Sequence, residues 1–185
     1  GGGIFGQFST VAADNDWRDY VFVHEFGHHF AALADEYYTS PVSYAAADTP
    51  RVEPWEPNVT ALLDPHHLKW RDRMVASTPV PTPWPKAAFE AHEREIQARR
   101  KQLREQRRPE SEMSALFREE QAYTDKLFAD VPNRDAVGAF QGANYSATGY
   151  YRAQLQCMMF TRADAFCDVC AHAIDQIIDL YSTAP

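Results

Sequence analysis

His24-Glu25-Phe26-Gly27-His28, continued to Leu33-Ala34-Asp35-Glu36-Tyr37-Tyr38, is the stretch from which the rest of this chain can be interpreted. Two histidines four residues apart on a helix lie on the same face, so both imidazoles can reach one metal ion. Neutral imidazole suits zinc, and a catalytic zinc site keeps three protein ligands and an open position for water. Glu25 can take a proton from that water and pass it to a leaving amine. The motif therefore predicts zinc at His24 and His28, with Glu25 as general base.

The motif needs a helix, and we predict one over residues 13–33. Residues with capping side chains stand at its start: Asp14, Asn15 and Asp16. Apolar residues form a stripe beside the histidine face: Phe22, Phe26, Phe30 and Leu33. This pattern predicts a buried helix whose histidines point into a cleft.

The third metal ligand must come from beyond this helix. A straight helix from His28 to Asp35 would rise about 10 Å, which is too far for both residues to touch one ion. The chain is therefore expected to turn sharply near Ala31 or Ala32, so that Asp35 returns to the metal. Glu36 is the immediate alternative.

The stretch from His24 to Tyr38 resembles the signature of the bacterial IgA-peptidase family of zinc metallopeptidases (igalysin-type). These enzymes are metzincin-like, so the resemblance implies an α+β catalytic domain, one catalytic zinc ion, an acidic third ligand at Asp35 and hydrolysis of protein or peptide substrates by an endopeptidase. One departure is Ala31, which stands where metzincins have the glycine of the turn. Left-handed backbone costs alanine energy that it does not cost glycine.

The composition limits the partners of the chain. Its 185 residues carry a net charge of −8, which argues against nucleic acid or an anionic membrane as partner. No apolar run reaches the roughly 18 residues of a membrane span. No signal peptide is visible, but the family resemblance implies a secreted, cell-surface or periplasmic protein. The oligomeric state is not indicated.

The resemblance also bears on domain organisation. Metzincin-like domains have most of their sheet before the zinc helix, so residues 1–185 are expected to be the mostly helical C-terminal portion of a catalytic domain that lacks its N-terminal part. Residues 4–12 are predicted as a strand from their β-favouring residues. The resemblance implies that this strand edges the cleft and pairs with substrate, and an ordinary edge strand is the alternative.

Two further regions follow the zinc motif. Nine of the twelve prolines lie in residues 39–85, which predicts an irregular segment with a short helix around Pro65–Met74. Three tryptophans are expected to pin this segment to the body: Trp55, Trp70 and Trp84. Residues 86–130 are predicted to form a solvated helical hairpin insertion, broken at Pro109, because a net basic half precedes a net acidic half and apolar residues keep helical spacing in both.

Residues 136–160 again resemble the family. Metzincins place a methionine of a tight turn beneath the zinc, and the resemblance implies Met159 in this role, with Met158 as the alternative. A methionine that only fills a gap in the core is the simpler interpretation. A last helix is predicted over residues 164–182, with an apolar face that runs to Tyr181.

The three cysteines leave several possibilities open. Cys157 paired with Cys167 or with Cys170 would give one disulfide and one free thiol in an exported protein. Cys167 and Cys170 have the spacing of a redox pair, although no thioredoxin-like pattern surrounds them. Three cysteines and a histidine are also a set that binds structural zinc, but the spacing does not favour it.

Two other functions compete with the zinc endopeptidase. In a thermolysin-like hydrolase, a distant glutamate would supply the third ligand, and the candidates are Glu90, Glu93 and Glu119. The other rival is a catalytically silent, metzincin-like module that binds a substrate or glycan. The intact Glu25 argues against this module, because a binding protein has no need of a general base.

Overall fold

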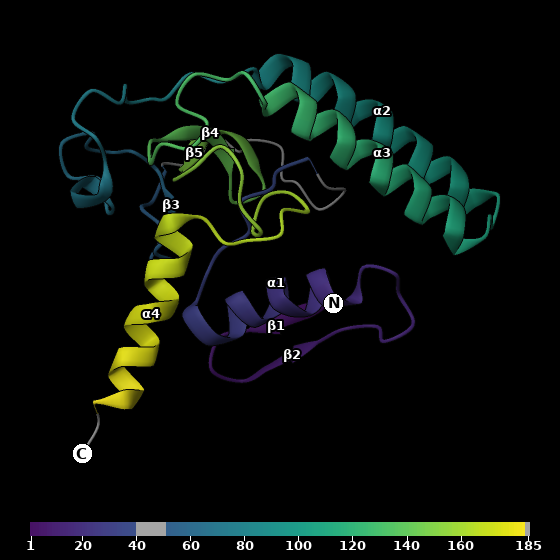
Figure 1. The fold of residues 1–185 in the computed structure, drawn as a ribbon, viewed down its shortest axis with the longest axis horizontal. Coiled ribbons are helices and arrows are strands. Elements are labelled where there is room, and N and C mark those ends of the chain that lie inside the picture. The colour runs from purple at the N-terminus through teal and green to yellow at the C-terminus, as the bar shows by residue number, and fades with distance from the viewer. Residues whose placement is uncertain (40–50, 184–185) are drawn as a thin grey trace.

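The computed structural model describes residues 1–39 and 51–183. Figure 1 shows a mixed domain in which helices lie around one small sheet, while a second small sheet lies at the edge, beside the first helix. In chain order the elements are β1 (Gly2–Ile4), β2 (Phe8–Thr10), α1 (Arg18–Ala31), β3 (Val59–Thr60), a 3-10 turn (Arg71–Arg73), α2 (Lys86–Glu105), α3 (Glu110–Phe128), β4 (Phe140–Ala143), β5 (Ser146–Arg152) and α4 (Asp168–Ser182). The predicted combination of helices and sheet is therefore present in the described residues.

The N-terminal segment is a hairpin, so the prediction of one strand over residues 4–12 is wrong. β1 pairs antiparallel with β2, with Ile4 opposite Phe8. Gly6 lies between them with a φ of 68°, which glycine adopts without strain. The hairpin packs on α1 so closely that a side chain at Gly3 would meet the backbone of Glu25. It therefore lies directly beside the predicted metal motif.

Helix α1 begins later than predicted and buries a different face. Its N-cap is Trp17, whose backbone N–H donates to Asn15 Oδ1 at 2.7 Å in a turn before the helix. Phe22, on the predicted buried stripe, is 52% exposed. The side that faces the body instead contains His24, Gly27 and Ala31. Of the predicted stripe, Phe30 and Leu33 do contact the core, so the stripe is buried only in its second half.

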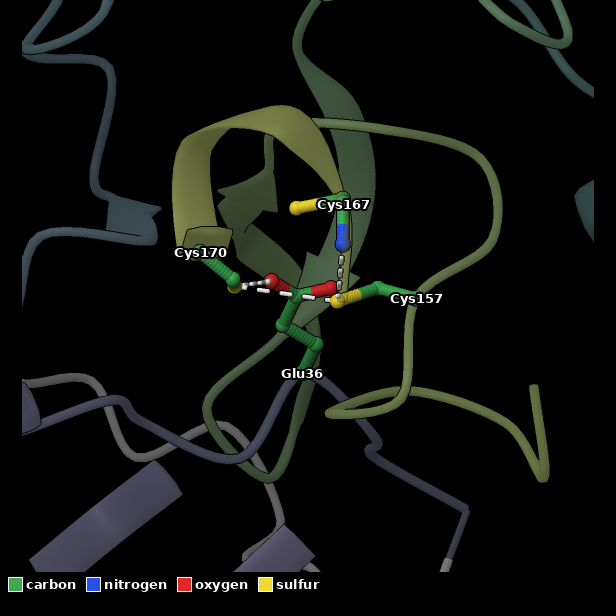
Figure 2. Close-up of side chains that lie close together, drawn as sticks. All are labelled: Glu36, Cys157, Cys167 and Cys170. Atoms are coloured by element: carbon green, nitrogen blue, oxygen red, sulfur yellow. Dashed lines mark hydrogen bonds between the residues drawn. The ribbon is translucent and has the colours of Figure 1, made fainter. Parts of the chain in front are cut away.

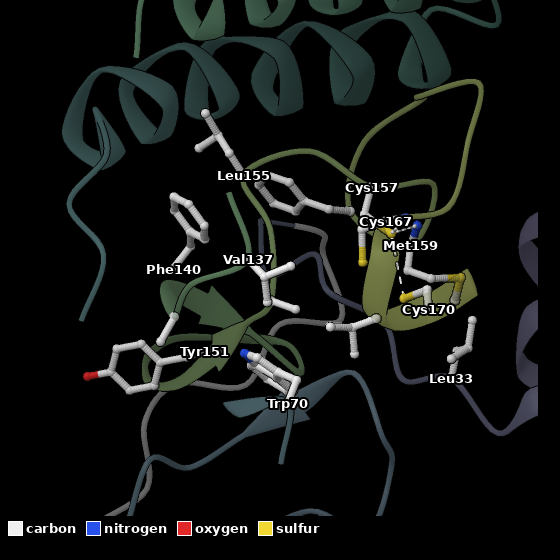
Figure 3. Packing of buried hydrophobic residues seen from close by; sticks show 14 of the residues in the cluster. Leu33, Trp70, Val137, Phe140, Tyr151, Leu155, Cys157, Met159, Cys167 and Cys170 are labelled. Carbon is white, nitrogen blue, oxygen red and sulfur yellow. Dashed lines mark hydrogen bonds between the residues drawn. The ribbon is translucent and has the colours of Figure 1, made fainter. Parts of the chain in front are cut away.

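The second sheet has the order β3-β5-β4 and is antiparallel throughout. The main core gathers around it and below the hairpin helices, as Figure 3 shows for Phe140, Trp70 and Leu155. Trp70 is buried and donates its indole N–H to Gly138 O at 2.7 Å, which ties the proline-rich segment to the strands.

The remainder of the proline-rich segment departs from its prediction in two places. Trp55 is 68% exposed and its ring lies 5.8 Å from that of the exposed Phe5, so it does not pin the segment to the core as expected. The predicted short helix around Pro65–Met74 is reduced to the 3-10 turn. Residues 40–50 of this segment lie outside the described residues.

Helices α2 and α3 occupy the region in which the helical hairpin was predicted. α2 and α3 lie side by side (Figure 1), and the basic and acidic halves meet in a bidentate ion pair between Arg99 and Glu119. Ile96, Met113 and Leu116 form its own small core. The hairpin also joins the main core through its inner ends, where Phe89 of α2 stacks on Phe128 of α3, so it is not only a solvated insertion.

Helix α4 begins at Asp168, four residues later than predicted, and only its first half is buried. Val169, Cys170 and Ala173 enter the core, whereas Tyr181 is exposed. Figure 1 shows the second half of the helix extending away from the domain. The predicted apolar face therefore ends well before Tyr181.

Among the helices that the structure describes, none combines the length and the apolar character required to cross a membrane.

Candidate metal centre and active site

The predicted sharp turn follows α1 directly. Ala31 is the last helical residue, and Ala32 takes the left-handed conformation with a φ of 55°. The N–H of Ala32 then bonds to Gly27 O, which ends the helix. The turn lies one residue beyond the position at which metzincins have glycine, so Ala31 itself carries no left-handed strain.

A buried asparagine holds the segment that follows the turn. Asn58 Oδ1 accepts the N–H of Ala34 at 2.8 Å, and Asn58 Nδ2 donates to Ala34 O at 2.9 Å. Nδ2 also donates to Glu36 Oε1 at 3.0 Å. Asn58 therefore holds the backbone before Asp35 and the side chain of the residue after it. Sequence reasoning missed this role, because the two segments are 24 residues apart.

Three predicted ligands meet at the end of this segment. Asp35 Oδ1 lies 2.9 Å from His24 Nε2 and 3.2 Å from His28 Nε2. The other ring nitrogens face backbone carbonyls: His24 Nδ1 donates to Met158 O at 3.0 Å, and His28 Nδ1 to Leu33 O at 2.5 Å. A histidine whose Nδ1–H donates to a carbonyl keeps its Nε2 lone pair for a metal.

The electrostatics of this group are those of a cation site. If both rings were neutral with the proton on Nδ1, two Nε2 lone pairs and a carboxylate oxygen would face one another, and these groups repel unless a proton or a metal ion lies between them. Burial alone would raise the pKa of Asp35, but hydrogen bonds from His24 and His28 hold it well below its usual range. Burial would lower the pKa of His28, but its bond to Asp35 outweighs this and raises it.

Glu25 lies beside this group at the mouth of a cavity. The cavity has a volume of about 400 Å³, and His24, Glu25 and Tyr37 form part of its wall. The opposite wall comes from the helical hairpin, which contributes Phe89, Glu93, Gln97 and Arg100 from α2. A half-buried carboxylate next to the first histidine is where the sequence predicts the general base, and the hairpin shapes the space in front of it.

Tyrosines complete the surroundings of the metal ligands. The hydroxyl of Tyr145 donates to Asp35 Oδ2 in a short hydrogen bond. The Tyr37 ring stacks on His24, with ring centres 6.1 Å apart, and meets Tyr145 edge-on. Burial, followed by the neighbouring Asp35, raises the pKa of Tyr145. The sequence did not indicate this role of Tyr145, which lies 110 residues from Asp35.

The two methionines after β5 take different positions. Met158 supplies its carbonyl oxygen to His24 and also accepts the hydroxyl of Tyr20 at 3.2 Å. Met159 is fully buried and packs against Gly27 of α1, where its Sδ would lie 3.1 Å from an added Cβ. The side chain beneath the motif helix is thus that of Met159, and Met158 contacts the site through its backbone.

The alternative third ligands lie elsewhere. Glu90 pairs with Lys86, Glu119 pairs with Arg99, and Glu93 accepts the Thr39 hydroxyl at 3.0 Å. Glu36 points toward the three cysteines and not toward the histidines. Within residues 1–39 and 51–183, the acidic side chain grouped with the two histidines is Asp35, and none of the three distant glutamates belongs to this group.

The site consists of a helix with two histidines and a glutamate, followed by a turn that brings an aspartate back to the histidines. This arrangement identifies the protein as a candidate metallohydrolase. Comparison with known families agrees with this class. The sequence matches the family described as IgA Peptidase M64 over residues 1–178, nearly its whole length, and the chain belongs to that family of peptidases. The family expected from the sequence is thereby confirmed. No curated protein matches the chain.

Proposed function

We propose that the chain is a zinc-dependent endopeptidase with a metzincin-like active site. The observation that carries the proposal is the convergence of His24 Nε2, His28 Nε2 and Asp35 Oδ1, whose donor atoms lie within 4.8 Å of one another. Family membership supports the peptidase activity. Two imidazoles and one carboxylate are a ligand set of catalytic zinc that leaves a position for water.

The residues present fit this metal. Both Nδ1–H groups donate to carbonyls, so both Nε2 atoms are oriented as ligands, and Tyr145 holds the second oxygen of Asp35. Zinc bound there would lower the pKa of water and polarise the scissile carbonyl of a peptide. Met159 would support the motif helix from below, at Gly27.

Glu25 performs the proton transfers in this proposal. It accepts a proton from the attacking water and delivers it to the amine that leaves. The cavity between α1 and α2 would hold substrate side chains, since Glu25 and the hairpin residue Phe89 both line it. The substrate is a protein or peptide, which the family implies.

The test measures zinc content and casein cleavage for the parent protein, Glu25→Gln and the control Glu95→Gln on the exposed side of α2. Glu25→Gln should keep the zinc of the parent and lose cleavage by about 10²-fold or more, because general-base catalysis contributes that much. Glu95→Gln should match the parent in both.

Two outcomes would contradict the proposal. If the His24→Ala/His28→Ala variant keeps as much zinc as the parent, the histidines are not ligands. If the parent binds zinc at the histidines and cleaves neither casein nor a library of unfolded peptides, the chain is a binding module.

A further inference from the structure

A second group of metal-binding side chains lies inside the core, apart from the histidines. It consists of Glu36, Cys157, Cys167 and Cys170, whose donor atoms lie within 4.8 Å of one another. Figure 2 shows the Glu36 carboxylate directed toward the three sulfur atoms. The residues come from three separate segments: the strand-like stretch after the turn, the loop after β5 and the first turn of α4.

The spacing of the donor atoms fits one tetrahedral ion. Cys157 Sγ lies 3.6 Å from Cys170 Sγ, and Cys170 Sγ lies 3.4 Å from Glu36 Oε1. Zinc with Zn–S bonds of about 2.3 Å places two sulfur ligands about 3.8 Å apart, and a sulfur and an oxygen ligand slightly closer. The sulfur–sulfur separation is close to an edge of that tetrahedron, and the Glu36 carboxylate lies at about the distance of a further ligand.

Glu36 supplies an independent indication of a ligand. Its side chain is 0% exposed, and among the described residues its Oε2 has no hydrogen-bond partner. A buried carboxylate oxygen without a partner is costly, commonly about 1–3 kcal/mol or more. A cation among the sulfurs would satisfy it. Asn58 already holds the other oxygen, Oε1, in place from outside the group.

Burial raises the pKa of the Cys157 thiol, but backbone donors face its sulfur. Its sulfur accepts two backbone N–H groups, from Cys167 at 3.3 Å and Met159 at 3.5 Å. Neutral thiols are weak acceptors, whereas hydrogen bonds to sulfur favour its charged form. The guanidinium of Arg152 is buried nearby and interacts electrostatically with Glu36 and Cys157, which offsets part of the negative charge of such a centre.

A disulfide explains less of this arrangement. All three thiols are free and buried, and the separation of Cys157 and Cys170 exceeds the roughly 2.05 Å of an S–S bond. A bond between them would leave Cys167 and the Glu36 carboxylate unexplained. The sequence suggested three cysteines with a histidine, but the fourth donor is a glutamate far away in the chain, which spacing alone does not reveal.

We propose that Glu36, Cys157, Cys167 and Cys170 bind a structural zinc ion, separate from the catalytic centre. A closed four-ligand site of this kind contributes folding energy and no chemistry. The ion would join α4 and the loop after β5, which contains Met158 and Met159, to the segment that carries Asp35. The catalytic aspartate would thus be held by a metal centre immediately behind it.

The test uses the whole chain with the catalytic histidines removed. His24→Ala/His28→Ala, purified under reducing conditions with zinc, should retain about one ion per chain, against about two in the parent. Replacement of that ion by Co(II) should produce a sulfur-to-cobalt charge-transfer band in the near ultraviolet, which a centre of histidine and carboxylate ligands lacks. This experiment leaves every ligand of the new centre intact, so it does not depend on a destabilised variant.

A second variant tests the fourth ligand. Glu36→Gln in the same background should shift the cobalt spectrum and release zinc to a chelator at least about 10-fold faster, because a neutral amide is a weaker ligand. The proposal is overturned if the double-histidine variant holds no metal, if its cobalt form lacks the sulfur band, or if peptide mapping finds Cys157 bonded to Cys170. If parent and double-histidine variant hold the same single ion with the sulfur band, the cysteine centre stands and the catalytic centre fails.

Discussion

The carboxylates of Asp35 and Glu36 point to opposite sides of one extended segment. Asp35 Oδ1 lies 2.9 Å from His24 Nε2, whereas Glu36 Oε1 lies 3.4 Å from Cys170 Sγ. Successive side chains of an extended backbone alternate in direction, so adjacent acidic residues cannot both reach one ion. The sequence left the third ligand open between these two residues, and the alternation assigns each to its own candidate centre.

This alternation predicts the effect of Asp35→Asn. An amide oxygen is a poorer zinc ligand than a carboxylate, so zinc content should fall by about one ion per chain and casein cleavage should be lost. The control is Asp64→Asn, at an exposed aspartate that contacts His67, which should keep the zinc and the activity of the parent. Metal analysis after dialysis against a weak chelator measures the difference. Unchanged zinc in Asp35→Asn would mean that Asp35 is not a ligand.

The left-handed turn predicts that glycine has opposite effects on stability at two neighbouring positions. Ala32→Gly relieves a left-handed alanine, while Ala31→Gly weakens the last turn of α1. Both changes remove one buried methyl group, so their difference reports the backbone alone. The free energy of unfolding of Ala32→Gly should exceed that of Ala31→Gly by about 2 kcal/mol, measured by urea denaturation. Equal stabilities would place the turn elsewhere.

The local features of the site could be predicted from the sequence, because the spacing of these residues allows only one arrangement in which they meet. His24 and His28 share a face only on a helix, and Asp35 can join them only after a turn at Ala31 or Ala32. The helical hairpin was equally accessible, since charge and apolar spacing change together at Pro109. In each case the relevant residues lie within a few turns of one another.

The features that were missed depend on contacts distant in sequence. Asn58 bonds to Ala34, the residue before Asp35, from 24 residues away, and Tyr145 reaches Asp35 across 110 residues. The apolar spacing along α1 also did not predict which face of the helix is buried at Phe22. Periodicity shows that a helix is amphipathic, but it does not show which element covers the apolar face. Phe22 therefore remains exposed, and the opposite face, with Gly27 against Met159, is the buried one.

The hydroxyl of Tyr145 predicts a measurable effect on metal affinity. Tyr145→Phe removes the hydrogen bond to Asp35 Oδ2 and keeps the ring against Tyr37. Loss of a partner that orients a metal ligand typically lowers affinity 10–100-fold, so the dissociation constant for zinc at the histidine centre should rise by about that factor. Competition with a chromogenic chelator measures it.

The matched control for this change is Tyr150→Phe. Tyr150 lies in the same β4–β5 hairpin, but its hydroxyl donates at 3.5 Å to the exposed carbonyl of Val52. The affinity of this variant for zinc should equal that of the parent. If Tyr145→Phe binds zinc as tightly as Tyr150→Phe, then the contact of Tyr145 with Asp35 does not support the metal site.

The buried carboxyl of Glu93 predicts how stability depends on pH. Burial, together with the neighbouring Glu120, raises the pKa of Glu93 from 4.5 to about 8. Between these values the folded protein holds a proton that the unfolded chain has released, so the free energy of unfolding falls as the pH rises through this window and levels off above it. Ionised Glu93 would lie in the cavity wall beside a second carboxylate, Glu120, which pairs with Arg162.

Glu93→Gln removes this titration while its amide oxygen can still accept the Thr39 hydroxyl. At pH 5 the variant should match the parent, and at pH 8.5 it should be more stable by on the order of 3 kcal/mol. Glu95→Gln is the control on the same helix, because that side chain is 65% exposed and should leave the pH dependence unchanged. Urea denaturation at both pH values gives the comparison. If Glu93→Gln and the parent are equally stable at both pH values, Glu93 ionises in the folded protein as it does in water. The helical hairpin would then present a charged wall to the cavity.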